Sequence, residues 1–129
     1  MKQLKLAATA RTPLVILDPS AGTLVMDGES YPEDVNGFYQ PIMDAVAAFC
    51  AQPKARLAVD IKLIYFNSSS ARALSDLCDL LDAQAGDGAS IQLTWFCDDD
   101  DDITREFAED LALDMVHLRI AIAKLQKDG

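Results

Sequence analysis

Long apolar runs, basic residues and histidine are all scarce in this chain, and each scarcity argues against a class of function. No uninterrupted apolar stretch approaches the roughly 20 residues that cross a bilayer. The 11 basic residues are outnumbered by 21 acidic ones, and the resulting formal charge of −10 repels nucleic acid and anionic membranes. The apolar stretch near the N-terminus is too short and too interrupted for a signal peptide, so we expect a cytoplasmic protein.

Signatures of catalysis and cofactor binding are also scarce. The single histidine, His117, is accompanied by no nucleophile-elbow pattern, and the six glycines form no phosphate-binding loop. The three cysteines, Cys50, Cys78 and Cys97, show no metal-binding spacing and lie in apolar contexts. We therefore expect buried, reduced thiols, no cofactor, no metal site and no enzyme activity.

Half of the 129 residues are hydrophobic, which predicts one folded domain over residues 1–129. Apolar periodicity predicts strands over residues 13–18, 23–27, 56–66 and 90–96, and three helices. The first helix is expected to start at Ser30 and either to kink at Pro41 or to begin only shortly before it. The second follows residue 70. The third is marked by the apolar positions Ile103, Phe107, Ala108 and Leu111.

The last segment, residues 115–123, alternates in polarity and favours a strand, with a continued helix as the alternative. In the long strand, Leu57 to Tyr65 at every second position are expected to share one buried face. The resulting order, β-β-α-β-α-β-α-β, predicts an α/β fold. It is a single mixed β-sheet of about five strands, with helices packed mainly on one face.

One junction combines a strand end, an amide and three consecutive hydroxyls: Asn67, Ser68, Ser69 and Ser70. A helix N-terminus carries unpaired backbone N–H groups and the positive end of the helix dipole, so it attracts an anion. Asn and Ser are also favoured helix caps. Local chemistry leaves both interpretations open, a structural cap and a site of phosphorylation or anion binding.

A run of five aspartates, residues 98–102, precedes the third helix. It lacks the spaced acids and central glycine of a Ca²⁺ loop. A solvated acidic turn that supplies negative charge to a helix N-terminus is the simplest interpretation. A docking surface for a basic partner and metal-assisted chemistry are the alternatives.

Three sequence blocks resemble one known family. Residues 28–33, Gly-Glu-Ser-Tyr-Pro-Glu, resemble its G-x-S-Y-P-E motif, and residues 63–70, Leu-Ile-Tyr-Phe-Asn-Ser-Ser-Ser, resemble its L-x-Y-x-N-T-S-S motif. Trp95, followed by the acidic run and by Glu106, Glu109 and Asp110, resembles its third block. The family is that of SiaC, the bacterial biofilm-regulation phosphoprotein. Its fold resembles the STAS type of the anti-sigma-factor antagonists.

The resemblance implies a non-enzymatic, partner-switching phosphoprotein. In that family a partner kinase phosphorylates the first hydroxyl of the T-S-S element, and a PP2C-type phosphatase removes the phosphate. The unphosphorylated form binds and activates a GGDEF-domain diguanylate cyclase, which raises cyclic-di-GMP. The alternative is a STAS-like module that binds a small ligand or anion at the helix N-terminus of residues 67–70.

The resemblance places the switch at Ser68, where the family usually has Thr, with Ser69 as a competing acceptor. The expected partner-binding or positioning residues come from the first two blocks and their flank: Tyr31, Pro32, Glu33, Tyr65, Asn67, Ser69, Ser70 and Arg72. The third block departs from the family, because Phe107-Ala108 stands between Glu106 and Glu109 where a glycine is usual.

Overall fold

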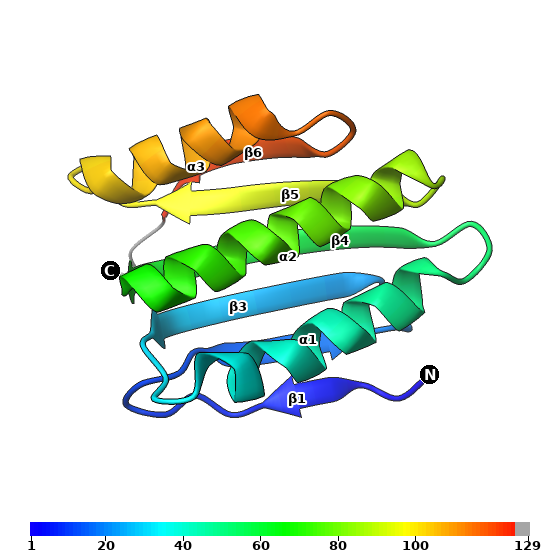
Figure 1. Cartoon of the computed structure of the whole chain (residues 1–129), viewed down its shortest axis with the longest axis horizontal. Helices are drawn as coiled ribbons and strands as arrows, with labels where there is room; N and C mark the ends of the chain where they lie inside the picture. The colour runs from blue at the N-terminus through cyan, green and yellow to red at the C-terminus, as the bar shows by residue number, and fades with distance from the viewer. Residues whose placement is uncertain (126–129) are drawn as a thin grey trace.

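The structure is a computed structural model that describes residues 1–125 (Figure 1). It contains six strands and three helices in the order β1-β2-β3-α1-β4-α2-β5-α3-β6. The strands are β1 (Leu4–Leu6), β2 (Leu14–Asp18), β3 (Thr23–Ser30), β4 (Arg56–Phe66), β5 (Ser90–Cys97) and β6 (Arg119–Lys124). The helices are α1 (Val35–Cys50), α2 (Ser68–Gly86) and α3 (Asp102–Asp114).

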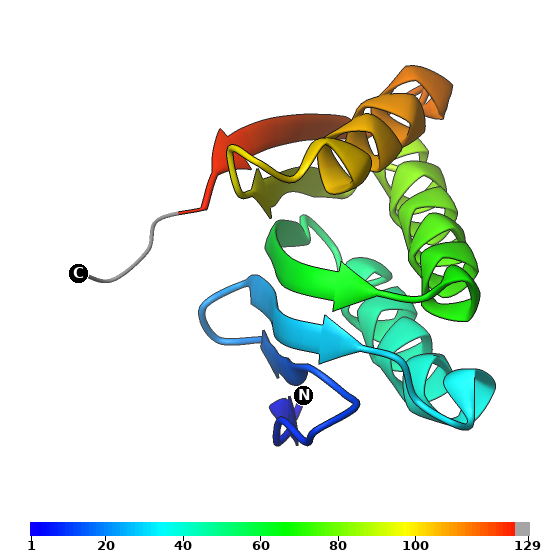
Figure 2. The same cartoon turned by 90° about the vertical axis from the view of Figure 1, so that its left-hand side faces the viewer.

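The strands form one sheet in their sequence order, β1 to β6. The first two pairings are antiparallel, and the pairings from β3 to β6 are parallel. Each parallel step moves the chain in the same direction across the sheet. Because such crossovers share one handedness, their helices come to the same side. All three helices therefore cover one face (Figures 1 and 2), which confirms the expected mixed sheet with one-sided helices.

The expected strand count was one too low, because β1 is too short to show an apolar periodicity. This strand has three residues, and Leu4 and Leu6 alone provide its apolar side. They lie beside Leu17 and Val15 on β2, whose side chains are fully buried. A strand this short is specified by the strand that it pairs with and not by its own pattern.

The core lies between the sheet and the helix layer. Its largest fully buried side chains include Trp95 on β5, Tyr39 and Ile42 on α1, and Leu74 and Leu77 on α2. All three cysteines are free and buried, as expected. Burial raises the pKa of the Cys78 thiol to about 12, and the nearby Asp79 carboxylate acts in the same direction. None of the helices in residues 1–125 has the length and apolar character that a bilayer crossing requires.

The first helix begins later than expected. Ser30 does not start it but ends β3, and the N-cap is Asp34, whose carboxylate accepts a hydrogen bond from the N–H of Gly37 at 3.0 Å. Pro41 lies within α1, which begins almost two turns before it. The backbone pairing of β3 with β4 extends to Ser30, and this pairing overrides the local preference of a hydroxyl for a helix cap.

The ambiguous last segment is a strand, as favoured, but it starts only at Arg119. In α3, Ile103 is 82% exposed, although it is one of the apolar positions that marked this helix in the sequence. Thr104 takes the inward position beside Ala108 and Leu111. The N-cap Asp101 accounts for this, because it binds both the N–H (3.0 Å) and the hydroxyl (2.6 Å) of Thr104.

Candidate functional site

The junction of residues 67–70 lies at the edge of the sheet where the parallel strands end. β3, β4 and β5 run in the same direction, so the loops after Ser30, Phe66 and Cys97 leave from one side. The helices α2 and α3 both begin at this edge, as Figure 1 shows. In open α/β sheets this carboxyl edge is the usual place for a functional site. The three sequence blocks, which are distant along the chain, are therefore brought together here.

Asn67 forms the N-cap of α2. Its side-chain oxygen accepts a hydrogen bond from the N–H of Ser70 at 2.9 Å, and its backbone N–H donates to the carbonyl of Ser30 at 3.2 Å. The first bond starts the helix, and the second joins that start to the end of β3. Asn67 thus positions the junction through both its side chain and its backbone.

The three serines after Asn67 occupy different environments. Ser68 and Ser69 are exposed, whereas Ser70 is completely buried. The hydroxyl of Ser30 donates to that of Ser70 at 2.9 Å and lies 2.6 Å from the hydroxyl of Tyr39. Burial raises the pKa of Tyr39, against the opposing effect of these hydroxyls. The Ser70 hydroxyl is therefore enclosed by the protein, while Ser68 and Ser69 present accessible hydroxyls.

The electrostatic setting of α2 differs from that of α3. The first turn of α3 contains Asp102, but the first turn of α2 contains no acidic side chain. The N–H groups of the first helical residues, Ser68 and Ser69, have no acceptor within a helix. A phosphate on either serine would therefore meet free donors and the positive end of the α2 dipole.

A one-residue shift in register shapes the strand that leads into the site. Gly28 pairs with Leu63 and Glu29 with Tyr65, so Ile64 has no partner on β3. Gly28 has φ +129°, a conformation that side-chain-bearing residues rarely adopt. The shift is a β-bulge, which re-aims the side chains that follow it.

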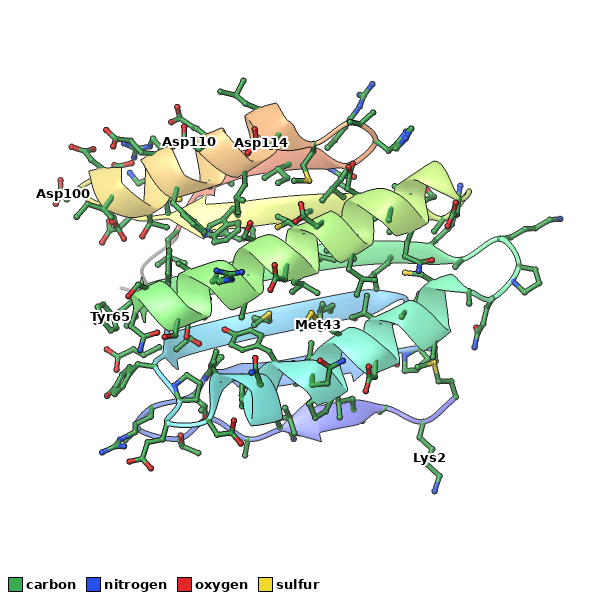
Figure 3. The ribbon with its side chains drawn as sticks, viewed as in Figure 1. Lys2, Met43, Tyr65, Asp100, Asp110 and Asp114 are labelled. Carbon is green, nitrogen blue, oxygen red and sulfur yellow. The ribbon has the colours of Figure 1, made fainter. Side chains whose placement is uncertain are left out.

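The bulge corrects the expectation that Tyr65 lies on the buried face. Ile64 is 58% and Tyr65 51% exposed, whereas Phe66 turns inward. The Phe66 ring packs against Trp95 (6.3 Å between centroids) and Phe107 (5.1 Å), which anchors the residue before Asn67. Two large side chains are thus presented to solvent shortly before Ser68 and Ser69, and Figure 3 shows Tyr65 at this edge.

Tyr31 joins the first block to the second. Its ring meets that of Tyr65 edge-on at 5.8 Å, and its hydroxyl donates to the carbonyl of Ala10 at 2.7 Å. Glu33 pairs with Arg11, whose backbone carbonyl accepts from the N–H of Tyr31 at 2.7 Å. Pro32, between them, is half-buried. The loop before β2 therefore supports the site, a contribution of Arg11 that no sequence motif signalled.

Arg72 is exposed on α2, one turn after Ser68. No other residue in the first two turns of that helix, residues 68–75, has a basic side chain. It therefore lies exposed at the same end of α2 as Ser68 and Ser69.

The aspartate run lies at the same edge and serves the fold. Asp101 caps α3, Asp102 pairs with Arg105 at 3.1 Å, and Asp99 pairs with Lys124 at 2.8 Å. Within residues 1–125, no group of three or more His, Cys, Asp or Glu side chains has a geometry that could hold a metal ion. The run is an acidic helix start, as the simplest interpretation held, and it makes this edge strongly negative.

The chain is similar to known proteins over nearly its whole length. The family model described as "SiaC family regulatory phosphoprotein" matches residues 6–125. An uncharacterized protein of Pseudomonas aeruginosa strain UCBPP-PA14 is 34% identical over 114 residues, which are 88% of this chain and 90% of that protein.

Solved structures show the same similarity. The crystal structure of apo-SiaC from Pseudomonas aeruginosa has 33% identity and a TM-score of 0.88, with 95% of this chain and 99% of that one covered. The same values hold for a crystal structure in which SiaC of that organism, described as an activator, is bound to the diguanylate cyclase SiaD.

Proposed function

Because the chain belongs to the SiaC family of regulatory phosphoproteins, we propose that it activates a GGDEF-domain diguanylate cyclase and is switched off by phosphorylation at Ser68. In this proposal the chain has no catalytic activity of its own. A partner kinase adds the phosphate, and a PP2C-type phosphatase removes it. The relative that binds a cyclase supports the activator role, and the carboxyl edge supports the location of the switch.

The observation that carries the proposal is the contrast between the exposed Ser68 and the buried Ser70 within one helix turn. A kinase needs an accessible hydroxyl, which Ser70 does not offer. Ser68 follows the exposed side chains of Ile64 and Tyr65 by four and three residues along the chain. A phosphate at Ser68 would add nearly two negative charges to a surface on which a partner can dock, and it would repel any acidic group of that partner.

The direct test incubates the chain with its cognate kinase and ATP and locates the phosphate by mass spectrometry. We expect phosphate on Ser68, and none on the chain after addition of the phosphatase. Ser68→Ala should bind the cyclase as the unmodified chain does, whereas Ser68→Asp should bind at least about tenfold more weakly, as expected for a like charge placed in an interface.

Ser69 provides the matched control, because it is also exposed and lies one residue away. Ser69→Ala should still be phosphorylated and should still activate the cyclase. Phosphate found only outside residues 68–70, or equal cyclase affinity of Ser68→Ala and Ser68→Asp, would contradict the proposal.

One observation favours a second candidate, an anion-binding module at the same helix end. The first turn of α2 has free N–H donors and no acidic side chain. Thermal-shift measurements with nucleotides and phosphorylated metabolites test this function. Stabilisation of the chain at millimolar ligand, lost in Ser68→Asp, would support it, and no stabilisation would exclude it.

A further inference from the structure

The sheet has a second face, which none of the helices in residues 1–125 covers. Figure 2 shows the helix layer on one side of the sheet and none on the other. A solvated face is usually polar, with apolar residues at alternate positions only on the covered side. Here β2 is apolar at four consecutive positions. The open face therefore presents half-buried or exposed apolar side chains from four strands: Leu14, Ile16, Val25, Ala58, Ile64 and Phe96.

The open face is also electrically balanced. By strand alternation and register, four basic and four acidic side chains belong to it: Lys5, Arg56, Lys62 and Arg119, with Asp18, Asp27, Glu29 and Asp60. The chain as a whole has a charge of −10, so its excess of acid lies on the helices, the loops and the carboxyl edge. This face is where a second acidic chain can approach without local repulsion.

Four neighbouring side chains, one from each of β2 to β5, form a row across the open face. When the order of this row is reversed, each side chain lies opposite one of complementary character. Leu14 lies beside Asp27, and Asp27 lies beside Lys62. The amino group of Lys62 is 5.2 Å from the centre of the Phe96 ring, which completes the row. The order is apolar, acidic, basic, apolar. A two-fold axis parallel to the strands, between β3 and β4, would set Asp27 opposite Lys62 of a second copy and Leu14 opposite its Phe96.

The adjacent row is compatible with the same axis. This row consists of Ile16, Val25, Asp60 and Thr94. The two-fold axis would place Ile16 opposite Thr94 of the second copy. Asp60 would lie opposite Val25 of the second copy. The positive charge of Lys62, two positions further along the same face of β4, would balance the negative charge of Asp60.

We propose that two copies of this chain pair through the open face, sheet on sheet. Six strands about 4.8 Å apart, each about six residues of roughly 3.3 Å, give a projected face of about 600 Å². The accessible area of a side-chain-covered surface exceeds its projection, so each copy approaches the roughly 800 Å² of a standard interface. The acidic helix layers lie behind the two sheets, beyond the screening length of about 8 Å at physiological salt.

The test measures the mass of the full-length chain by sedimentation equilibrium over a range of concentrations. The wild type should show twice the chain mass. In the Lys62→Asp variant, each of the two Asp27 side chains would face an aspartate of the other copy. This repulsion should raise the dissociation constant of the dimer about tenfold or more. The double variant Asp27→Lys with Lys62→Asp restores each pair with its signs exchanged and should restore the dimer.

Lys2→Asp is the matched control. It makes the same change of charge at an exposed residue that points away from the sheet (Figure 3), and it should leave the dimer unchanged. Circular dichroism identifies any variant that fails to fold. For that case, a carbodiimide can join Asp27 to Lys62 in a mixture of ¹⁴N- and ¹⁵N-labelled wild-type chains. Cross-linked peptides with one light and one heavy partner would support the pairing.

Three results would overturn the inference. The first is a monomeric wild type at every concentration up to about 100 μM, a range in which specific interfaces of this size normally form. The second is a dimer that Lys62→Asp does not weaken. The third is a set of Asp27–Lys62 cross-links that only ever join two residues of the same chain, without mixed isotopes.

Discussion

Three consecutive serines show how the fold assigns different roles to identical side chains. Ser68 and Ser69 face solvent at the start of α2, and Ser70 is enclosed by Ser30 and Tyr39. A helix turns by about 100° per residue, so neighbouring positions cannot share one environment. Accessible and enclosed hydroxyls are thus separated over a single turn, which starts at the N-cap Asn67.

At the residue scale, negative charge at Ser68 should stabilise the fold while it weakens partner binding. An anion in the first turn of a helix contributes about 0.3–1 kcal/mol at an exposed position. Ser68→Asp should therefore raise the free energy of unfolding by that amount in urea titrations. A lower stability would contradict the prediction, since loss of cyclase binding would then reflect unfolding. Ser69→Asp, with the same charge one residue on, is the control for stability.

The buried hydroxyl cluster of Ser30, Tyr39 and Ser70 should contribute to stability. Tyr39→Phe removes the oxygen that lies 2.6 Å from Ser30, and the loss of a buried hydrogen bond costs about 1–2 kcal/mol. Urea unfolding should show this decrease at an unchanged m-value. Ser69→Ala, which removes an exposed hydroxyl, should change stability by less than about 0.5 kcal/mol. Equal effects of the two substitutions would argue against a role for the cluster.

At the scale of elements, a single carboxylate joins α2 to the segment between α3 and β6. Asp82 accepts hydrogen bonds from the backbone N–H groups of Val116, His117 and Leu118, the shortest at 2.6 Å. Desolvation acts to raise the pKa of Asp82, but these three bonds outweigh it, and the pKa is lowered. The contact links residues 34 to 36 positions apart and aligns the start of β6 with the sheet.

The lowered pKa of Asp82 gives a pH-dependent prediction. A carboxylate that titrates lower in the folded state stabilises the fold above its unfolded pKa, and this contribution is lost as the pH falls through the folded value. Asp82→Asn should cost about 1–2 kcal/mol near pH 7, in line with hydrogen bonds to a charged group. The difference from wild type should narrow below about pH 4. Asp79→Asn, an exposed neighbour on α2, should show no such convergence.

At the scale of the whole molecule, charge and burial divide the protein into distinct regions. The helices and the carboxyl edge carry the excess of acid, and Figure 3 shows Asp100, Asp110 and Asp114 on that part of the surface. The open face of the sheet is balanced. The core between them contains three free thiols, of which Cys78 is fully buried and Cys50 and Cys97 are 6% and 3% exposed.

The labelling of Cys78 should therefore report global unfolding. Cys78 is fully buried and its pKa is raised to about 12, so its reactive thiolate is rare in the native state. Native protein with excess iodoacetamide should label Cys78 at the rate set by global opening, as measured by mass spectrometry. Cys50, which is 6% exposed, should react no more slowly. Labelling of Cys78 within the dead time would show that the core opens locally, contrary to the prediction.

The sequence by itself determined the features that depend on neighbouring residues. A helix cap at residues 67–70 and an acidic helix start at the aspartate run were among the interpretations that the sequence supported, since capping hydrogen bonds span only three positions. The apolar alternation of β4 as far as Leu63 followed from periodicity, and the packing of helices mainly on one face followed from the order of the elements. The motif blocks identified the family, and the comparisons confirmed it.

Only the tertiary structure decided the features that depend on distant residues. Ser70 is buried because Ser30, 40 residues away, ends a strand above it. Tyr65 is exposed because a bulge opposite Gly28 reverses the alternation that predicted its burial. β1 forms because its backbone pairs with the edge strand β2. Arg11 belongs to the site because it forms an ion pair with Glu33. Pairing and burial are set by what the folded chain brings into contact, and no local pattern records those contacts.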